Sequence, residues 1–296
     1  MARLGRTCHS AGAVCNPVTP LRFVSDRRPS TESATILAVP GPLIVNRQER
    51  PICSVKEWGV LAKPASPVHW QDGRSAKELA EAWIDGTGPA ALGKLLARDA
   101  RTADLQVKKA TAEAQTAFDS LPGGRRNHDL LIEGDAAGGP TIVGLEGKAD
   151  ESFGETLDGF GRAARRKADR GERTNAPQRL ERLLADLAGT SLEARPELGK
   201  LRYQLFSGVA GTLAATGPDD QAVFVVHEFK TPRTTQRRRD ANAADIALFV
   251  EQVFGGVVPA GEEWWLVGPL RVPAARWART PLWIGHLTTG PHVPHG

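Results

Sequence analysis

The sequence predicts an α/β protein in which a mixed sheet is flanked by helices. The segment Gln221–Lys230 (QAVFVVHEFK) carries a nearly continuous Val and Phe run, which is typical of a central strand buried on both faces. Residues 129–133 and 141–148 form two shorter strand-like segments around a glycine-rich stretch, which indicates a β-hairpin. Segments with helical periodicity lie before, between and after these strands. This order favours a mixed sheet with helices on its faces.

The first 50 residues are expected to form a poorly ordered or loosely docked arm. They are rich in Arg, Ser, Pro and Gly, and their apolar residues are scattered apart from 36–39 and 43–45. The arm holds seven Arg and three acidic residues, an excess that accounts for the whole formal net charge of +4. A nucleic-acid surface therefore has to come from local patches in the remainder. We expect a single globular domain over 51–290 and a tail over 291–296.

The three cysteines, Cys8, Cys15 and Cys53, predict no disulfide framework. Their number is odd, they lie in the first fifth of the chain, and their spacing fits no zinc site. The chain has no run of 18 apolar residues and no clear apolar segment of a signal peptide. We therefore expect a cytoplasmic protein without a membrane partner.

Helices are expected in the first half of the chain. Ser75 is predicted as the N-cap of a helix, with Glu78 at the capping-box position. A short helix is predicted over 90–97, and a longer one over 103–121, ending at a Pro-Gly-Gly sequence. Further helices are expected at 154–170, 178–188, 196–215 and 241–254, with final strands at 263–267 and 281–287.

The predicted hairpin carries the residues that indicate chemistry. Residues i and i+2 of a strand share a face, so Glu146 and Lys148 point the same way, and Gly147 leaves the other face free for close packing. Hairpin pairing, across a loop at 134–140 that is longer than the tight types, can bring Asp129 beside Glu146. Two neighbouring carboxylates repel unless a cation lies between them. Together with the Gly147 carbonyl they offer the oxygen ligands that Mg²⁺ prefers, and Lys148 could position or activate water or neutralise charge on a phosphate.

Asp129 in NHDLLIEG, followed by Glu146-Gly147-Lys148 in TIVGLEGKADE, resembles the PD-(D/E)XK nuclease superfamily. The resemblance covers about residues 100–255 and includes the order helix, hairpin, helix and further strand. It implies a restriction-endonuclease-like core and an uncharacterised bacterial family within the superfamily.

The resemblance also implies a metal-dependent phosphodiester hydrolase that acts on nucleic acid, DNA rather than RNA. Asp129, Glu146 and Gly147 would bind Mg²⁺ or Mn²⁺, which polarises the phosphodiester, and Lys148 would assist the nucleophile. Glu113, expected on the helix before the hairpin, would be an additional catalytic acid. Such nucleases often dimerise, so a homodimer remains open.

Two positions depart from the family pattern. His128 replaces the proline that precedes the first acid. One branch of the superfamily carries a Gln-to-Tyr motif on the helix after the hairpin. Here Gln204, in Leu201-Arg-Tyr-Gln-Leu-Phe206, is the only candidate, and its order is reversed.

A second ExK sequence, Glu228-Phe229-Lys230, ends the predicted central strand. It has no preceding strand with its own acid, which favours a strand end that emerges into solvent. Glu228 or Lys230 could instead be auxiliary to the hairpin site. His227 points to the opposite face and is expected to be a core histidine.

Two basic clusters are candidate phosphate-binding surfaces. Arg162, Arg165 and Arg166 lie on the helix after the hairpin, and Arg237 and Arg238 lie in a predicted loop after the central strand. Basic side chains beside a metal site can contact phosphates. A solvated helix face explains the same pattern.

Two alternatives to the nuclease stay open. The hairpin charges could form one cross-strand ion pair on a solvent-exposed face. The chain could also be an inactive member of the same fold that serves as a binding or scaffolding module. A small-molecule enzyme has less support, because the sequence has no glycine-rich phosphate loop, no GxSxG motif and no nucleophilic cysteine in a recognisable setting.

Overall fold

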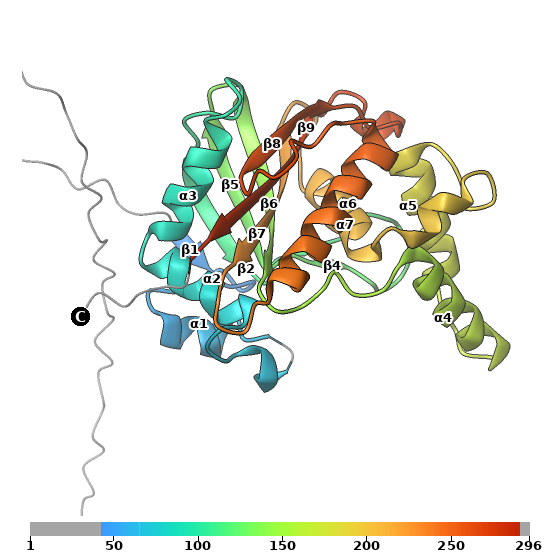
Figure 1. Cartoon of the computed structure of the whole chain (residues 1–296), viewed down its shortest axis with the longest axis horizontal. Coiled ribbons are helices and arrows are strands. Elements are labelled where there is room, and N and C mark those ends of the chain that lie inside the picture. Colours follow the sequence, from blue (N-terminus) through green and yellow to red (C-terminus); the bar gives the residue numbers. More distant parts are fainter. Residues whose placement is uncertain (1–42, 65, 291–296) are drawn as a thin grey trace, which may run out of the picture. The chain divides into compact units, whose positions relative to one another are not determined.

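A seven-stranded mixed sheet is the centre of the domain in the computed structural model, which describes residues 43–64 and 66–290 (Figure 1). The expected tail and all but the last eight residues of the expected arm lie outside these described residues. The strands are β1 (Leu43–Val45), β2 (Gln106–Ala112), β5 (Leu130–Ala136), β6 (Gly139–Lys148), β7 (Gln221–Phe229), β8 (Trp265–Leu270) and β9 (Leu282–Thr289). Their spatial order is β1-β2-β5-β6-β7-β9-β8.

The sheet is antiparallel through β2, β5 and β6 and parallel through β6, β7 and β9. The two edge strands differ, because β1 runs parallel to β2 and β8 runs antiparallel to β9. The parallel pairs need long crossover connections, and helices supply these crossovers. The predicted fold class, a mixed sheet flanked by helices, is confirmed.

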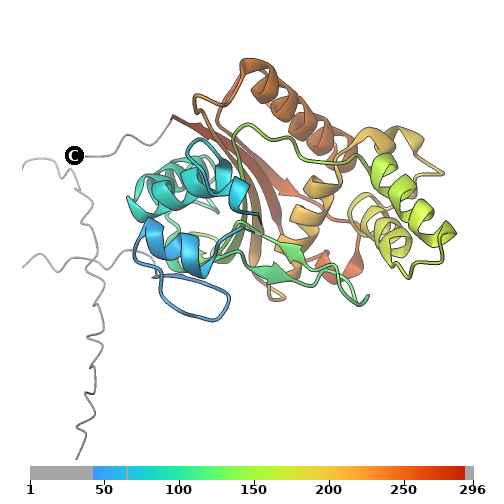
Figure 2. The same cartoon turned by 90° about the horizontal axis from the view of Figure 1, so that it is seen from below.

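Helices cover both faces of the sheet (Figure 2). One group comprises α1 (Val55–Leu61), the 3₁₀ turn η1 (Pro67–His69), α2 (Ser75–Ile84) and α3 (Thr87–Leu96). The other comprises α4 (Leu157–Asp169), α5 (Ala176–Ala188), α6 (Tyr203–Ala214) and α7 (Gln236–Phe254), with the 3₁₀ turns η2 (Pro196–Lys200) and η3 (Ala275–Trp277). No helix within residues 43–64 and 66–290 is long and apolar enough to cross a membrane.

Strand β7 is buried along its whole length, as its composition predicts. Val223 and Val225 pack in one apolar cluster with residues of α2 and α3. Phe224 and Val226 pack in a second cluster with residues of α5, α6 and α7. The period-two alternation of a strand thus divides its apolar side chains between two cores.

Three local expectations are wrong. Residues 103–121 do not form a helix, because they contain β2 and then β3 (Gln115–Thr116), which pairs with β4 (Arg126–Asn127) in a separate two-stranded sheet. The hairpin loop is shorter than expected, since Ala136 pairs with Gly139. The cap of α2 is Arg74 rather than Ser75, and Glu78 accepts a hydrogen bond from the Gly73 amide at 2.8 Å.

Two features of the N-terminal part differ from the expectations. Leu43–Val45, within the expected arm, is strand β1 and pairs with β2. Cys53 is disulfide-bonded. This corrects the expectation that the three cysteines form no disulfide.

Gly144 of β6 lies where α6 crosses the sheet. A Cβ atom at Gly144 would lie 2.0 Å from Thr212 Oγ1, whereas the nearest atom to a Cβ at Gly147 would be Asp129 Oδ2 at 3.5 Å. We therefore expect Gly144→Ala to lower the free energy of unfolding by about 1–3 kcal/mol, a typical cost of overpacking. Gly147→Ala is the matched control, with an expected change within about 0.5 kcal/mol. Urea unfolding curves measure both, and equal losses would contradict this account of helix packing.

Buried His227 should make the fold sensitive to acid. Its Nε2 atom lies 2.9 Å from Thr289 Oγ1, and burial, with a smaller effect of His286, lowers the His227 pKa to about 3. The unfolded chain then binds a proton below about pH 6.5 that the folded protein excludes, so this stabilisation is present above pH 6.5 and lost as pH falls. From pH 6.5 to pH 5 the expected loss is about 2 kcal/mol. His227→Asn should flatten the pH dependence of the unfolding free energy, and an unchanged slope would contradict the assignment.

Candidate active site

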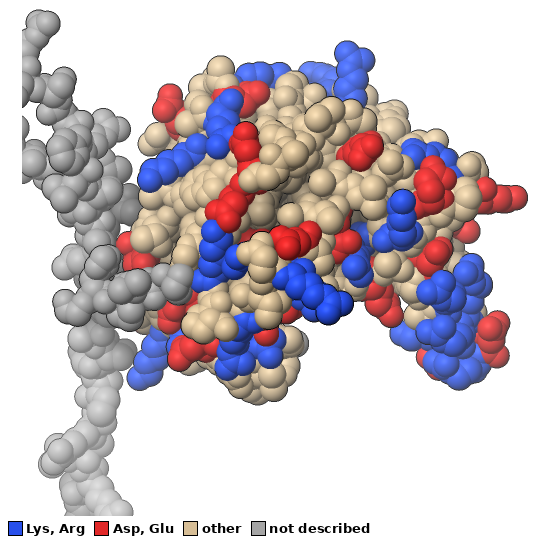
Figure 3. Space-filling model, in the orientation of Figure 1, with Lys and Arg blue, Asp and Glu red and all other residues tan. Residues whose placement is uncertain are grey.

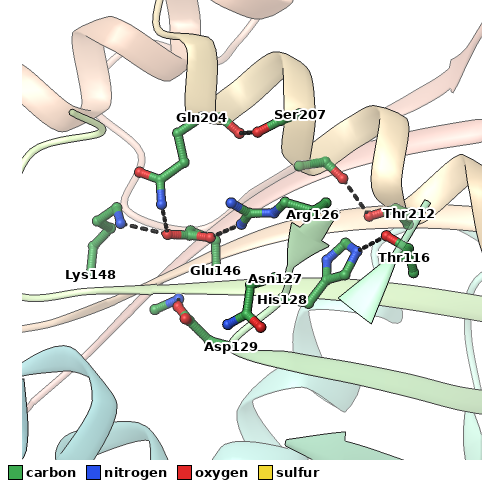
Figure 4. A network of polar contacts seen from close by, with 12 residues as sticks. Thr116, Arg126, Asn127, His128, Asp129, Glu146, Lys148, Gln204, Ser207 and Thr212 are labelled. Carbon is green, nitrogen blue, oxygen red and sulfur yellow. Dashed lines mark hydrogen bonds and ion pairs between the residues drawn. The ribbon is translucent and has the colours of Figure 1, made fainter. Parts of the chain in front are cut away.

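Glu146 is the centre of a buried polar network at the end of β6. It is 2% exposed, and its Oε1 atom accepts a hydrogen bond from Lys148 Nζ at 2.6 Å. Gln204 Nε2 donates to the same oxygen, and Arg126 Nη2 forms an ion pair with Oε2. Figure 4 shows the three donors converging on Glu146, with Asp129 below them. Both oxygens of the carboxylate are therefore engaged.

The path of β6 explains why a charged pair is buried here. Residues 144, 146 and 148 are every second residue of β6, so they share the face of the sheet that α6 covers. Small residues of α6 let this helix lie close to that face. A Cβ atom at Gly208 would lie 2.6 Å from the Phe224 ring, and one at Gly211 would lie 2.6 Å from Arg126 Cγ. The helix therefore brings Gln204, in its first turn, onto the Glu146 carboxylate.

Arg126 and Lys148 keep Glu146 in its charged form. Burial alone would raise the Glu146 pKa, but the two cations outweigh burial and lower the pKa below its ordinary value. Burial would likewise lower the Lys148 pKa, and the charges of Glu146 and Asp129 outweigh it and raise this pKa. Lys148 is thus an ammonium group, 3% exposed, with Nζ 5.2 Å from the centre of the Phe153 ring.

Asp129 accepts a hydrogen bond from the backbone of Gly147, the residue of β6 between Glu146 and Lys148. Its Oδ2 atom accepts a hydrogen bond from the Gly147 amide at 2.7 Å, just before the first pair of the hairpin, Leu130 with Leu145. Burial raises the Asp129 pKa well above its ordinary value, and the negative charge of Glu146 raises it further. The charges of Glu146 and Lys148 thus act on Asp129, although its carboxylate lies 3.5 Å from the Cβ position of Gly147, which points away from the face that Glu146 and Lys148 share.

Glu113 lies next to this site, but it is not helical. It occupies the turn between β2 and β3 with a φ of 54°, in the left-handed region. Its amide donates to the Asp129 carbonyl at 3.1 Å, and Asn127 Nδ2 donates to its carboxylate. Burial raises the Glu113 pKa, with the hydrogen bond from Asn127 opposing this shift.

The two charged residues of the second ExK sequence, Glu228 and Lys230, lie in different environments. Glu228 is 2% exposed, so the expectation of a solvent-exposed strand end is wrong for this residue. Its Oε1 atom accepts from Asn242 Nδ2 at 3.1 Å, and its Oε2 atom lies 3.5 Å from His286 Nε2. Lys230 instead pairs with Glu263 at 2.5 Å on the surface. Glu228 is the register partner of Lys148 on the neighbouring strand, but no hydrogen bond joins the two side chains.

The basic clusters lie on two helices. Arg162, Arg165 and Arg166 are exposed on α4, where Figure 3 shows a dense group of basic side chains. Arg237 and Arg238 lie in the first turn of α7, so the expected loop at this position is wrong. Arg237 is exposed and Arg238 is half-buried.

The match to known families covers most of the chain. A family model described as a domain of unknown function, DUF6946, matches residues 51–272. The chain belongs to the DUF6946 family. No curated protein and no solved structure matches this DUF6946 chain.

Arg126 is a residue of the candidate site that the sequence alone did not indicate. It lies three positions before Asp129, but its place depends on the small sheet of β3 and β4 and on the crossing of α6. The only sequence signal was a basic pair, Arg125-Arg126, just before the first acid. The predicted auxiliary residue Gln204 does contact the site.

The carboxylates at this end of β6 have the chemistry of hard-cation ligands, and both oxygens of Glu146 already have protein partners. The carboxylates of Asp129 and Glu146 flank the backbone of Gly147, and such oxygen ligands are those that Mg²⁺ takes while it keeps several waters. No group of three or more His, Cys, Asp or Glu side chains among residues 43–64 and 66–290 could hold a metal ion. A cation here would thus rely on two carboxylates, a backbone carbonyl and water.

Proposed function

We propose that this protein is a metal-dependent phosphodiester hydrolase acting on nucleic acid, DNA rather than RNA. The observation that carries the proposal is the hydrogen bond from the Gly147 amide to the Asp129 carboxylate, which places Asp129 at the residue of β6 that lies between Glu146 and Lys148 in the sequence. The topology supports it, because helices precede three antiparallel strands, β2, β5 and β6, and a helical connection leads to the parallel strand β7. The resemblance to PD-(D/E)XK nucleases implies a helix, a hairpin, a helix and a further strand; the hairpin, the helical connection and the further strand are present here, whereas strands replace the helix expected at 103–121.

The residues have separate roles in this proposal. Asp129, Glu146 and the Gly147 carbonyl would hold Mg²⁺ or Mn²⁺, which supplies the polarisation of the phosphodiester. Lys148 is already protonated, so it acts as a hydrogen-bond donor to a phosphate oxygen and not as a general base. Glu113, coupled electrostatically to Asp129, is the candidate for a further acidic group.

A cleavage assay tests the proposal directly. The full chain is incubated with single- and double-stranded DNA and RNA in the presence of Mg²⁺, Mn²⁺ or a chelator. Cleavage of DNA that depends on the metal and is lost in Asp129→Asn supports the proposal. Inert wild-type protein that also binds no metal in a titration would refute it.

The ion pair between Arg126 and Glu146 favours a second candidate function. A buried carboxylate that is already neutralised by a guanidinium needs no metal, which fits an inactive domain used as a binding or scaffolding module. Such a module would bind nucleic acid or another partner equally well with metal and with chelator. Cleavage by the wild-type protein would exclude it.

The basic face of α4 gives a prediction about binding. Replacing Arg162, Arg165 and Arg166 together by Gln should weaken the binding of DNA, because each phosphate contact releases a counterion. If all three contact phosphates, the slope of log K against log salt should become less steep by about 2.7 for a duplex. Fluorescence anisotropy of labelled DNA at several salt concentrations measures this slope.

A matched control removes three exposed lysines outside α4, namely Lys56 of α1, Lys63 just after α1 and Lys94 of α3. The change in net charge is the same in both triple variants. We expect the salt slope of this control to stay at the wild-type value. Equal effects of the two triple variants would show that only net charge matters, and would contradict a binding role of α4.

A further inference from the structure

We propose that the guanidinium of Arg126 occupies the cation position at Glu146 and must be displaced when a divalent metal binds there. This inference rests on the metal site of the proposed function. Arg126 and Glu146 are both buried, with side-chain exposures of 9% and 3%, and they form a direct ion pair. Because Lys148 and Gln204 engage the other carboxylate oxygen, the oxygen that faces Arg126 is the one that a metal would need to take over.

The small sheet holds Arg126 against the site. Arg126 pairs with Thr116 across β3 and β4, and its aliphatic part packs on Gly211 of α6. The loop between the two strands is tied to α5, since Arg179 Nε donates to Asp119 Oδ2 at 2.8 Å. The backbone of Arg126 is therefore fixed, and a change at the site has to come from its side chain.

The guanidinium itself is incompletely satisfied. Its Nε atom is buried and has no hydrogen-bond partner among the described residues. A buried donor without a partner is costly, so the position of this side chain depends on its ion pair with Glu146. When that carboxylate takes another cation, the main attraction that holds the guanidinium disappears.

Electrostatics makes the two cations competitors. Glu146 already has two positive groups, and a divalent ion on the same carboxylate would lie within a few ångströms of Arg126 in a poorly screened interior. Each cation must then weaken the binding of the other by the same factor, because coupling between two binding events is reciprocal. Arg126 would thus set the metal affinity of the site.

Titration with Mn²⁺ alone tests this inference without relying on activity. Free Mn²⁺ is followed by electron paramagnetic resonance with the wild-type full chain and with Arg126→Gln, Arg125→Gln and Glu146→Gln. We expect Arg126→Gln to bind Mn²⁺ at least about tenfold more tightly than wild type, within the usual range of such couplings. Arg125 is the matched control, since it is the exposed neighbour on the same segment and its loss changes the net charge equally. Glu146→Gln, with its folding confirmed by circular dichroism, should bind no Mn²⁺ at this site.

The outcomes separate this inference from the proposed function. If Arg126→Gln binds Mn²⁺ and the wild type does not, the result would support the inference. Equal affinities of wild type and Arg126→Gln, with loss in Glu146→Gln, would overturn the inference and leave the metal site standing. Absence of Mn²⁺ binding in every variant would overturn both.

If Arg126→Gln does not fold by circular dichroism, Arg126→Lys replaces it. A shorter cationic side chain should then give tighter Mn²⁺ binding than wild type, and an unchanged affinity would overturn the inference.

Discussion

In the proposed hydrolase, Lys148→Met is expected to lower the rate of metal-dependent DNA cleavage by about 10²–10³-fold, the usual cost of losing one preorganised donor in an active site. The structure gives the reason, because the charges of Glu146 and Asp129 keep Lys148 protonated although it is buried. Under the proposed function, a fixed ammonium group beside the carboxylates would stabilise charge that develops on the phosphate. Single-turnover kinetics on a labelled duplex measure the cleavage step apart from binding.

The fold should tolerate this change better than the activity does. Without Lys148, the Glu146 carboxylate still has Arg126 and Gln204 as partners. We therefore expect Lys148→Met to bind Mn²⁺ and DNA while its cleavage rate falls. Lys94→Met, which removes an exposed lysine from α3, should cleave at the wild-type rate. A wild-type rate in Lys148→Met would remove Lys148 from the mechanism.

The hairpin site could be predicted from sequence because its geometry is local. Alternation along β6 fixes the common face of Glu146 and Lys148, and hairpin register carries Asp129 to the same end. The central strand β7 could also be predicted, since a long Val and Phe run can only be buried. These features need no knowledge of distant parts of the chain.

The surroundings of the site could not be predicted because they depend on distant contacts. Residues 103–121 are rich in alanine and charged residues, which favours a helix, yet pairing with β5 makes Gln106–Ala112 a strand. That change moves Glu113 from a helix to a left-handed turn. Arg126 reaches Glu146 only through the small sheet of β3 and β4, whose two-residue strands leave too little pattern in the sequence to detect.

Glu146→Gln is expected to lower the free energy of unfolding at pH 7 by about 3–5 kcal/mol, the usual cost of breaking a buried ion pair. The substitution leaves the positive charges of Arg126 and Lys148 buried without their shared carboxylate. It also places an amide group, itself a donor, among three donors. The Glu146 pKa is lowered in the folded protein, so its stabilisation is present above the ordinary glutamate range and is lost as pH falls through the folded value.

Asp129→Asn should raise the free energy of unfolding, whereas Glu146→Gln lowers it. Burial raises the Asp129 pKa, so its contribution to stability is present below the unfolded value of about 3.9 and is lost as pH rises through the folded value. An asparagine keeps an acceptor for the Gly147 amide without the cost of a buried charge. Thermal unfolding at pH 5 and pH 8 should therefore show a gain for Asp129→Asn that is larger at pH 8. If both variants were destabilised equally at both pH values, the two carboxylates would not differ in charge state. If instead Asp129→Asn is more stable and inactive, Asp129 is retained at a cost in stability, as expected for a metal ligand rather than a structural acid.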